Sequence, residues 1–86
     1  MEISFSPQFR RQFKKLEPSL QEEVLEKIEL FGSSKSHSSL RVHKLKGRLS
    51  GRMSFSVNYK YRIVFMWETK DKAALLLAVG DHAVSE

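Results

Sequence analysis

The first part of the chain combines one short extended pattern with two helical patterns. Ile3 and Phe5 alternate with polar neighbours, which predicts a short strand. The pair Ser6 and Pro7 suits a helix start, because serine caps a helix and proline fits its first turn. A second start follows at Pro18. Apolar residues at helical spacing form one side of each helix: Phe9, Phe13 and Leu16 in the first, and Leu20, Val24, Ile28 and Phe31 in the second.

The rest of the chain is dominated by strand patterns. Gly32 ends the second helix, and a serine-rich loop follows over residues 33–39. Strands are predicted over residues 42–49, 53–57, 61–67 and 73–79, with turns between them at 50–51, 58–60 and 68–72. The order β-α-α-β-β-β-β indicates an α+β fold. It has a four-stranded antiparallel meander, the first strand at one edge, and an antiparallel two-helix hairpin on one face.

Length and composition limit the architecture and the chemistry. The 86 residues are expected to form one domain, residues 1–86, around one core. The chain has no cysteine, which excludes disulfides, thiolate nucleophiles and cysteine-bound zinc and favours a reducing cytoplasm. The first residues do not resemble a signal peptide, and the apolar run at 73–79 is too short for a bilayer. We therefore expect a cytoplasmic protein without a membrane partner.

Positive charge is concentrated in the middle of the chain, whose net charge is +5. Residues 30–67 contain no acid and eight bases: Lys35, Arg41, Lys44, Lys46, Arg48, Arg52, Lys60 and Arg62. A block of one sign attracts polyanions. Charge alone leaves three interpretations open, namely a nucleic-acid surface, a surface for an acidic protein, and a solvated basic face.

Strand alternation and the histidines suggest candidate chemistry. Arg62 alternates with the apolar residues of its predicted strand, where it is suited to bind a phosphate or, alternatively, to pair with a carboxylate or lie in solvent. Two of the three histidines, His43 and His82, lie near strand ends that a meander can bring together. RNA cleavage needs a base for the 2′-hydroxyl, a cation for the phosphorane and an acid for the leaving oxygen. The competing interpretation is two surface histidines. Trp67 and Tyr61 suit base stacking or, equally, core packing.

Other nucleotide chemistries lack their motifs. The basic region has no paired carboxylates, which argues against a two-metal nuclease. Walker-type and Rossmann glycine patterns are absent from the sequence, and residues 59–62 do not match an RNA-recognition-motif signature. We therefore expect neither a metal nor another cofactor.

Several short motifs occur in a specific order. They are Ser6-Pro7-x-Phe9, LKGRLSGRMS at 45–54, YRIVF at 61–65 and Gly80-Asp81-His82. In this order and spacing the chain resembles the RelE/ParE toxin superfamily over nearly its whole length. The resemblance implies the same β-α-α-β-β-β-β fold, which the hydrophobic pattern predicts independently.

The resemblance also implies an activity and partners. RelE-like and YoeB-like members are toxins of type II toxin–antitoxin systems that cleave mRNA on the ribosome, in the 30S A site, and so inhibit translation. The ParE-like branch poisons DNA gyrase instead. The implied partners are a cognate antitoxin and ribosome-bound mRNA. A gyrase inhibitor and an inactive toxin-like binding module remain the alternatives.

The YoeB-like pattern implies a role for specific positions. Arg62 matches the arginine that contacts the scissile phosphate, and His82 matches a catalytic histidine, here the general acid. His43 falls where that branch has a glutamate as general base, and Ala83 replaces a tyrosine. The residues expected to bind the RNA backbone are Lys44, Lys46, Arg48 and Arg52.

Overall fold

The computed structural model describes residues 1–47, 51–81 and 84. The helices and strands are β1 (Glu2–Phe5), α1 (Pro7–Lys14), α2 (Pro18–Ser33), the 3-10 turn η1 (Ser38–Leu40), β2 (His43–Lys44), β3 (Met53–Ser56), β4 (Arg62–Thr69) and β5 (Ala73–Gly80). This is the predicted order of helices and strands. The described strands form one sheet in the order β1-β5-β4-β3-β2.

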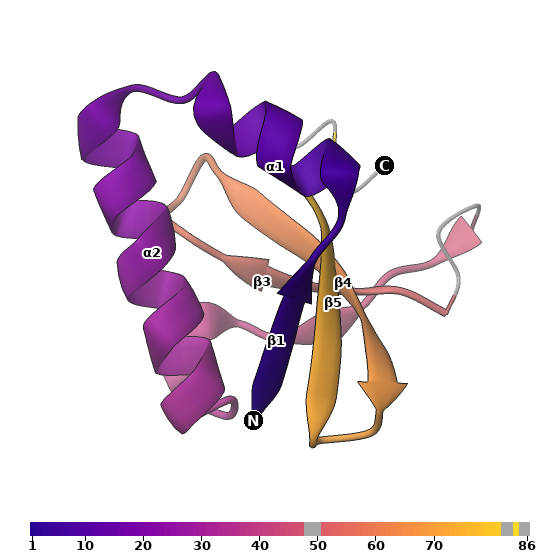
Figure 1. The fold of residues 1–86 in the computed structure, drawn as a ribbon. Coiled ribbons are helices and arrows are strands. Elements are labelled where there is room, and N and C mark those ends of the chain that lie inside the picture. Colours follow the sequence, from indigo (N-terminus) through magenta and orange to yellow (C-terminus); the bar gives the residue numbers. More distant parts are fainter. Residues whose placement is uncertain (48–50, 82–83, 85–86) are drawn as a thin grey trace.

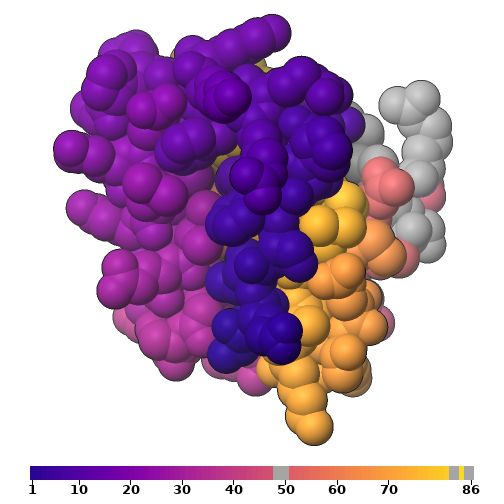
Figure 2. All heavy atoms as spheres, viewed as in Figure 1, coloured from indigo at the N-terminus to yellow at the C-terminus, as the bar shows by residue number. Residues whose placement is uncertain are grey.

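The sheet is mixed, because β1 pairs parallel to β5 while the other neighbouring strands are antiparallel. The meander and the edge position of the first strand are therefore confirmed. In Figure 1, α1 crosses the top of the sheet and α2 runs down its left side. The two helices of the predicted hairpin are consecutive but meet at a wide angle instead of lying side by side. Figure 2 shows the surface that β1, α1 and α2 form together, with the tip of the β4–β5 hairpin protruding at the lower end.

One strand is shorter than the sequence predicts. Strand β2 covers only His43–Lys44, whereas an extended segment was expected over residues 42–49, of which 48 and 49 lie outside the described residues. The reason lies in the backbone at Gly47, where φ is +69°, a value that turns the chain out of an extended conformation. The Leu45 amide still donates to the Arg52 carbonyl, which prolongs the pairing by one bond beyond the strand.

Helix α1 completes the edge of β5 where β1 ends. Strand β1 pairs with β5 only as far as Leu76, so the outer edge of β5 beyond that residue has no strand beside it. The Ser6 hydroxyl donates to the Leu77 carbonyl and accepts from the Phe9 amide, both at 3.0 Å. The Gln12 side-chain oxygen accepts from the buried Val79 amide at 2.9 Å. Side chains of the first helix thus satisfy backbone groups that a longer first strand would otherwise pair.

Replacing Gln12 with methionine is expected to destabilise the fold by about 1–3 kcal/mol, because the buried Val79 N–H loses its acceptor. Urea unfolding of the purified protein measures this difference. Gln8→Met is the matched control, since Gln8 is exposed on the same helix, and we expect almost no change there. Equal effects of the two substitutions would contradict the role assigned to Gln12.

The main core lies between the helices and one face of the sheet. Phe31 of α2 is fully buried and stacks on Phe55 of β3, with ring centroids 4.5 Å apart, and packs at a tilt against Phe65 of β4, 4.8 Å away. Trp67 extends this aromatic cluster at the end of β4. The odd-numbered residues of β4 therefore face the helices, as the alternation predicted, and its even-numbered residues face away.

A smaller apolar cluster lies on the helix-free face. It consists of Leu45, Val64 and Ala78, with Leu77 and Val84 packed against them. Val84, which follows β5 in the chain, lies on this face. Apolar side chains thus cover part of the helix-free face.

Candidate active site on the helix-free face

Two rows of paired residues cross the helix-free face of the sheet. In one row His43 of β2 pairs with Ser54, which pairs with Val64 and then Ala78. In the next row Ser56 pairs with Arg62, which pairs with Gly80. His43 and Arg62 therefore lie on one face, two strands and two residues apart. Standard strand geometry places their Cα atoms about 12 Å apart. At that separation both side chains can contact the same phosphodiester group.

The His43 ring has a defined tautomer. Its Nδ1 lies 2.8 Å from the Arg41 carbonyl oxygen. A carbonyl only accepts hydrogen bonds, so Nδ1 carries the proton and donates it. In the neutral ring the lone pair is then on Nε2, and the side chain is exposed. This arrangement gives His43 what a general base needs, an accessible lone pair on a ring held by a second hydrogen bond.

The carbonyl that orients His43 comes from an unusual backbone conformation. Arg41 lies in the left-handed region, with φ +50° and ψ +49°, at the end of η1. Such a conformation costs a residue with a Cβ about 1–2 kcal/mol. Strain of this kind is typical of segments that position functional groups. Sequence reasoning missed the role of Arg41, because no local motif indicates the direction of its carbonyl.

His37 shows the opposite tautomer. Its Nδ1 accepts from the Ser39 amide at 3.2 Å, so the neutral ring carries its proton on Nε2. This contact caps η1 at its N-terminus. His37 is therefore a structural histidine, and its ring cannot present a free lone pair on Nε2 as His43 does.

Arg62 is half-buried at the start of β4. Within residues 1–47, 51–81 and 84, no carboxylate lies within ion-pair distance of its guanidinium. The interpretation of Arg62 as one half of a structural ion pair thus finds no support in this part of the chain. A half-buried guanidinium without a carboxylate suits a phosphate, which it can bind through two parallel N–H donors.

Ser54 lies between His43 and Val64 and is fully buried. Among the described residues its hydroxyl has no hydrogen-bond partner. An unsatisfied buried hydroxyl costs about 1–3 kcal/mol, so the site keeps a polar group beside His43 at the expense of stability. Sequence analysis did not single out Ser54, although it is the serine that closes the LKGRLSGRMS motif.

Three of the four predicted RNA-binding residues lie in the part of the chain that the structure describes, namely Lys44, Lys46 and Arg52. Lys44 follows His43 in β2 and pairs with Met53, whose side chain packs against the main core, so Lys44 belongs to the helix side of the sheet. Lys46 is exposed just after β2, and Arg52 is exposed just before β3. Arg48 and His82 lie outside the described residues.

Val84 lies against Gly80, the residue that pairs with Arg62. A Cβ added to Gly80 would lie 2.5 Å from Cγ1 of Val84, which is closer than side chains pack. Val84 also donates its amide to the Asp81 carbonyl, and its side chain joins the apolar cluster of the helix-free face. The absence of a side chain at Gly80 therefore allows Val84 to lie close to the strand pair that carries Arg62.

Replacing Gly80 with alanine is expected to lower the activity of the protein about ten-fold, because the new methyl group displaces Val84 beside the strand pair that carries Arg62. The double variant Gly80→Ala/Val84→Ala removes the clashing Cγ1 and is expected to regain most of the loss. The activity and the melting temperature are measured for both variants. If the double variant is the more impaired of the two, displacement of Val84 is not the cause.

Two further properties bear on the kind of site. In the part of the chain that the structure describes, no three histidine, cysteine, aspartate or glutamate residues come together in a way that suits a metal ion. None of the helices described is both long and apolar enough to cross a membrane.

Comparison with known proteins identifies the family. A family model described as the RelE-like toxin of the type II toxin–antitoxin system HigB matches residues 7–82. The chain belongs to this family. It is therefore a RelE-like toxin of the type II toxin–antitoxin class. A comparison with curated protein sequences finds no match.

Solved structures of other toxins have the same fold. A YoeB/ParE toxin from Agrobacterium tumefaciens superposes with a TM-score of 0.76 at 13% identity, over 95% of this chain and 99% of that one. YafQ from E. coli strain BL21(DE3) gives 0.77 at 16% identity, over 96% and 94%. A chain of the YoeB–YefM complex from Staphylococcus aureus gives 0.73 at 21% identity, over 95% and 97%. These likenesses confirm that the whole domain has the RelE/YoeB toxin fold.

Proposed function

We propose that this toxin is a ribosome-dependent mRNA endonuclease that cleaves without a metal ion. The observation that supports this most directly is that His43 and Arg62 lie on the same face of the sheet. His43 offers a lone pair on Nε2, fixed by its contact with the Arg41 carbonyl. Arg62 offers a guanidinium that pairs with no carboxylate in the described part of the chain.

The proposed reaction is an attack of a ribose 2′-hydroxyl on the adjacent phosphorus. His43 Nε2 takes the 2′ proton as the new P–O bond forms. Arg62 stabilises the negative charge that develops on the non-bridging oxygens. His82 gives its proton to the departing 5′-oxygen as the old P–O bond breaks. The products are a 2′,3′-cyclic phosphate and a 5′-hydroxyl, with the proton moved in effect from one histidine to the other.

The same proposal includes the partners. Similar structures include the YoeB–YefM complex from Staphylococcus aureus and the E. coli DinJ–YafQ toxin–antitoxin complex. We infer that this toxin likewise has a cognate antitoxin, and that it acts in the cytoplasm on mRNA in the 30S A site. The exposed base Lys46, together with Arg48, would contact the RNA backbone around the cleaved bond.

Mapping of mRNA 5′ ends after brief induction tests the proposed activity. We expect new 5′ ends within translated reading frames, and their loss when translation initiation is blocked. Purified toxin, ribosomes and a defined mRNA should give the same cuts in a buffer whose only divalent cation is the magnesium that ribosomes need. Inhibition of gyrase supercoiling without RNA cuts would assign the chain to gyrase instead. Expression without growth arrest, cuts or gyrase inhibition would indicate an inactive binding module.

A further inference from the structure

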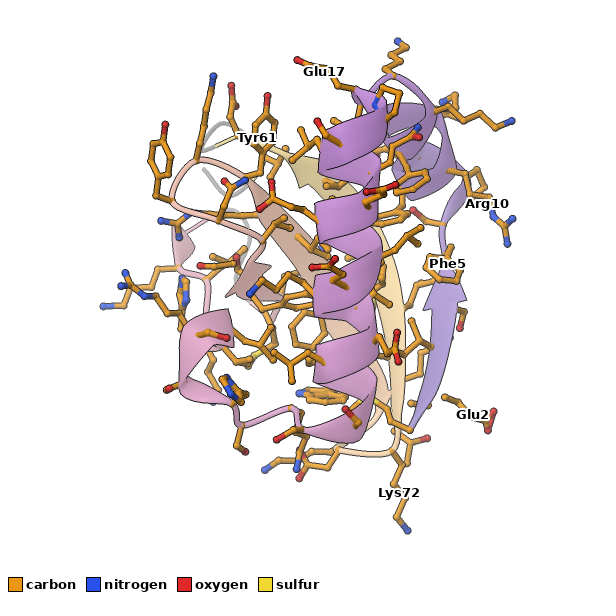
Figure 3. All side chains as sticks on the ribbon, turned by 90° about the vertical axis from the view of Figure 1, so that its left-hand side faces the viewer. Glu2, Phe5, Arg10, Glu17, Tyr61 and Lys72 are labelled. Atoms are coloured by element: carbon orange, nitrogen blue, oxygen red, sulfur yellow. The ribbon has the colours of Figure 1, made fainter. Side chains whose placement is uncertain are left out.

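A second basic surface lies on the opposite side of β2 from His43. It is a groove of about 970 Å³ between the segment that follows α2, the β2–β3 pair and the β4–β5 turn. Figure 3 shows the segment after α2 and the β4–β5 turn at the same lower end of the molecule. Five bases line the groove: Lys35, Arg41, Lys44, Arg52 and Lys70. Their charges converge although they come from four separate segments of the chain.

The groove has one acid among the described residues that line it, Asp71. Its carboxylate lies 4.0 Å from Lys35 Nζ, in an ion pair that links the segment after α2 to the β4–β5 turn. Both side chains are partly exposed, so the pair is weak. Lys44, Arg52 and Lys70 have no such partner in the described part of the chain. The groove therefore has a surplus of positive charge that is available to an anion.

An aromatic surface lies within this positive field. Trp67 lines the groove while it packs against Phe31, with ring centroids 5.8 Å apart, and edge-on against Phe65, 5.2 Å away. These two buried rings fix the indole in place, and part of it stays exposed. A rigid, partly exposed indole among lysines and arginines is the arrangement on which proteins stack the bases of single strands. An acidic peptide would use the charges but not the flat ring.

We propose that this groove is a second binding site for single-stranded RNA. One unpaired base stacks on Trp67, and the neighbouring phosphates lie against Lys44 and Lys70. The proposal deepens the proposed function and rests on RNA being the substrate. Lys44 and His43 are consecutive residues of the edge strand β2 and point to opposite faces. An RNA strand held in the groove thus needs only to pass around the edge of the sheet at β2 to reach His43 and Arg62. The groove therefore determines which stretch of mRNA is presented for cleavage.

The chain carries its own probe for this proposal, because Trp67 is its one tryptophan. A short 2′-O-methyl RNA, which cannot be cleaved, is titrated into the purified full-length toxin while tryptophan emission is recorded. We expect strong, saturable quenching. The same oligonucleotide with abasic residues is expected to bind about ten-fold more weakly and to leave the emission unchanged. RNA binding without any change in emission would overturn the proposal, and so would quenching by polyglutamate but not by RNA.

Two neighbouring lysines provide a matched pair of variants. Lys70 lines the groove, whereas Lys72, two residues on, points away from the molecule at its lower end (Figure 3). Lys70→Ala is expected to weaken RNA binding several-fold and to reduce the slope of log K against log salt by about 0.7, the value for one phosphate contact on a single strand. Lys72→Ala should match the parent protein. Equal affinities and slopes for the two variants would contradict a phosphate contact in the groove.

A substitution of Asp71 is expected to change the RNA affinity in the opposite direction to Lys70→Ala. It has φ +64°, a conformation that asparagine also accepts, so Asp71→Asn keeps the turn and removes the one acid found in the lining. Tighter RNA binding is expected, and weaker binding would count against the proposal. Arg62→Ala separates this inference from the proposed function. It should lower cleavage by about 10²–10³-fold and leave the quenching intact. A toxin that cleaves normally but shows no quenching would disprove the groove alone.

Discussion

Replacing Arg62 with alanine is expected to lower cleavage of ribosome-bound mRNA by about 10²–10³-fold, the usual effect of removing one group that stabilises transition-state charge. Arg62 is half-buried in the same sheet face as His43 and has no carboxylate partner among the described residues. Its loss should therefore leave the fold intact, with unfolding free energy changed by less than about 1 kcal/mol. Primer extension on a defined mRNA measures the cleavage, and urea unfolding measures the stability.

Two further substitutions make the Arg62 experiment specific. Arg62→Lys keeps the charge but loses the two parallel donors, so we expect an intermediate loss of about ten-fold. Arg11→Ala removes an exposed arginine from α1, on the other side of the molecule, and should leave cleavage unchanged. If Arg62→Ala keeps full activity, the phosphate contact assigned to this residue is wrong. A collapse of stability in the same variant would show that Arg62 supports the fold.

The sequence predicts the two faces of the sheet well because the side-chain period of a strand is visible in the residues themselves. Ile63 and Phe65 alternate with Arg62 and Val64, and the structure buries the first pair under the helices and turns the second pair away. The turn after β3 can also be predicted from nearby residues. The Asn58 side-chain oxygen accepts from the amides of Lys60 and Tyr61, which lie just before β4.

Other features depend on contacts that the sequence does not show. The parallel pairing of β1 with β5 joins residues about 70 positions apart, and no local pattern specifies its direction. Lys35 and Lys70 both line the groove. Lys35 belongs to the acid-free residues 30–67, whereas Lys70 lies in the part of the chain that also contains acids. The charge pattern therefore indicated a basic surface in residues 30–67 but could not show that part of that surface faces the helix side.

The division between Lys44 and His43 shows how a short strand changes a functional interpretation. The sequence places both residues in one basic segment, and the family resemblance places both near RNA. The register separates them, because Lys44 pairs with Met53 and His43 pairs with Ser54. We infer that RNA contacts both faces of β2, with the reaction on one side and part of the binding on the other.

Replacing His43 with glutamine is expected to reduce cleavage by about 10²–10⁴-fold, the contribution of a positioned general base. Glutamine is similar in length to histidine but has no basic nitrogen. His43→Glu has nearly the same shape as His43→Gln and restores a proton acceptor, so it should retain much more activity. The comparison isolates basicity from size. Cleavage of a defined mRNA on purified ribosomes measures it for each variant.

The control for the His43 variants is the histidine with the opposite tautomer. His37→Ala removes a ring whose Nδ1 caps η1 and whose neutral form has no lone pair on Nε2. A small loss of stability, about 1 kcal/mol, is expected from the missing cap, with cleavage per folded molecule unchanged. Equal activity of His43→Gln and His43→Glu would show that this position does not act as a base. The lone pair that the Arg41 carbonyl leaves on Nε2 would then have a different purpose, such as accepting a hydrogen bond from the bound RNA.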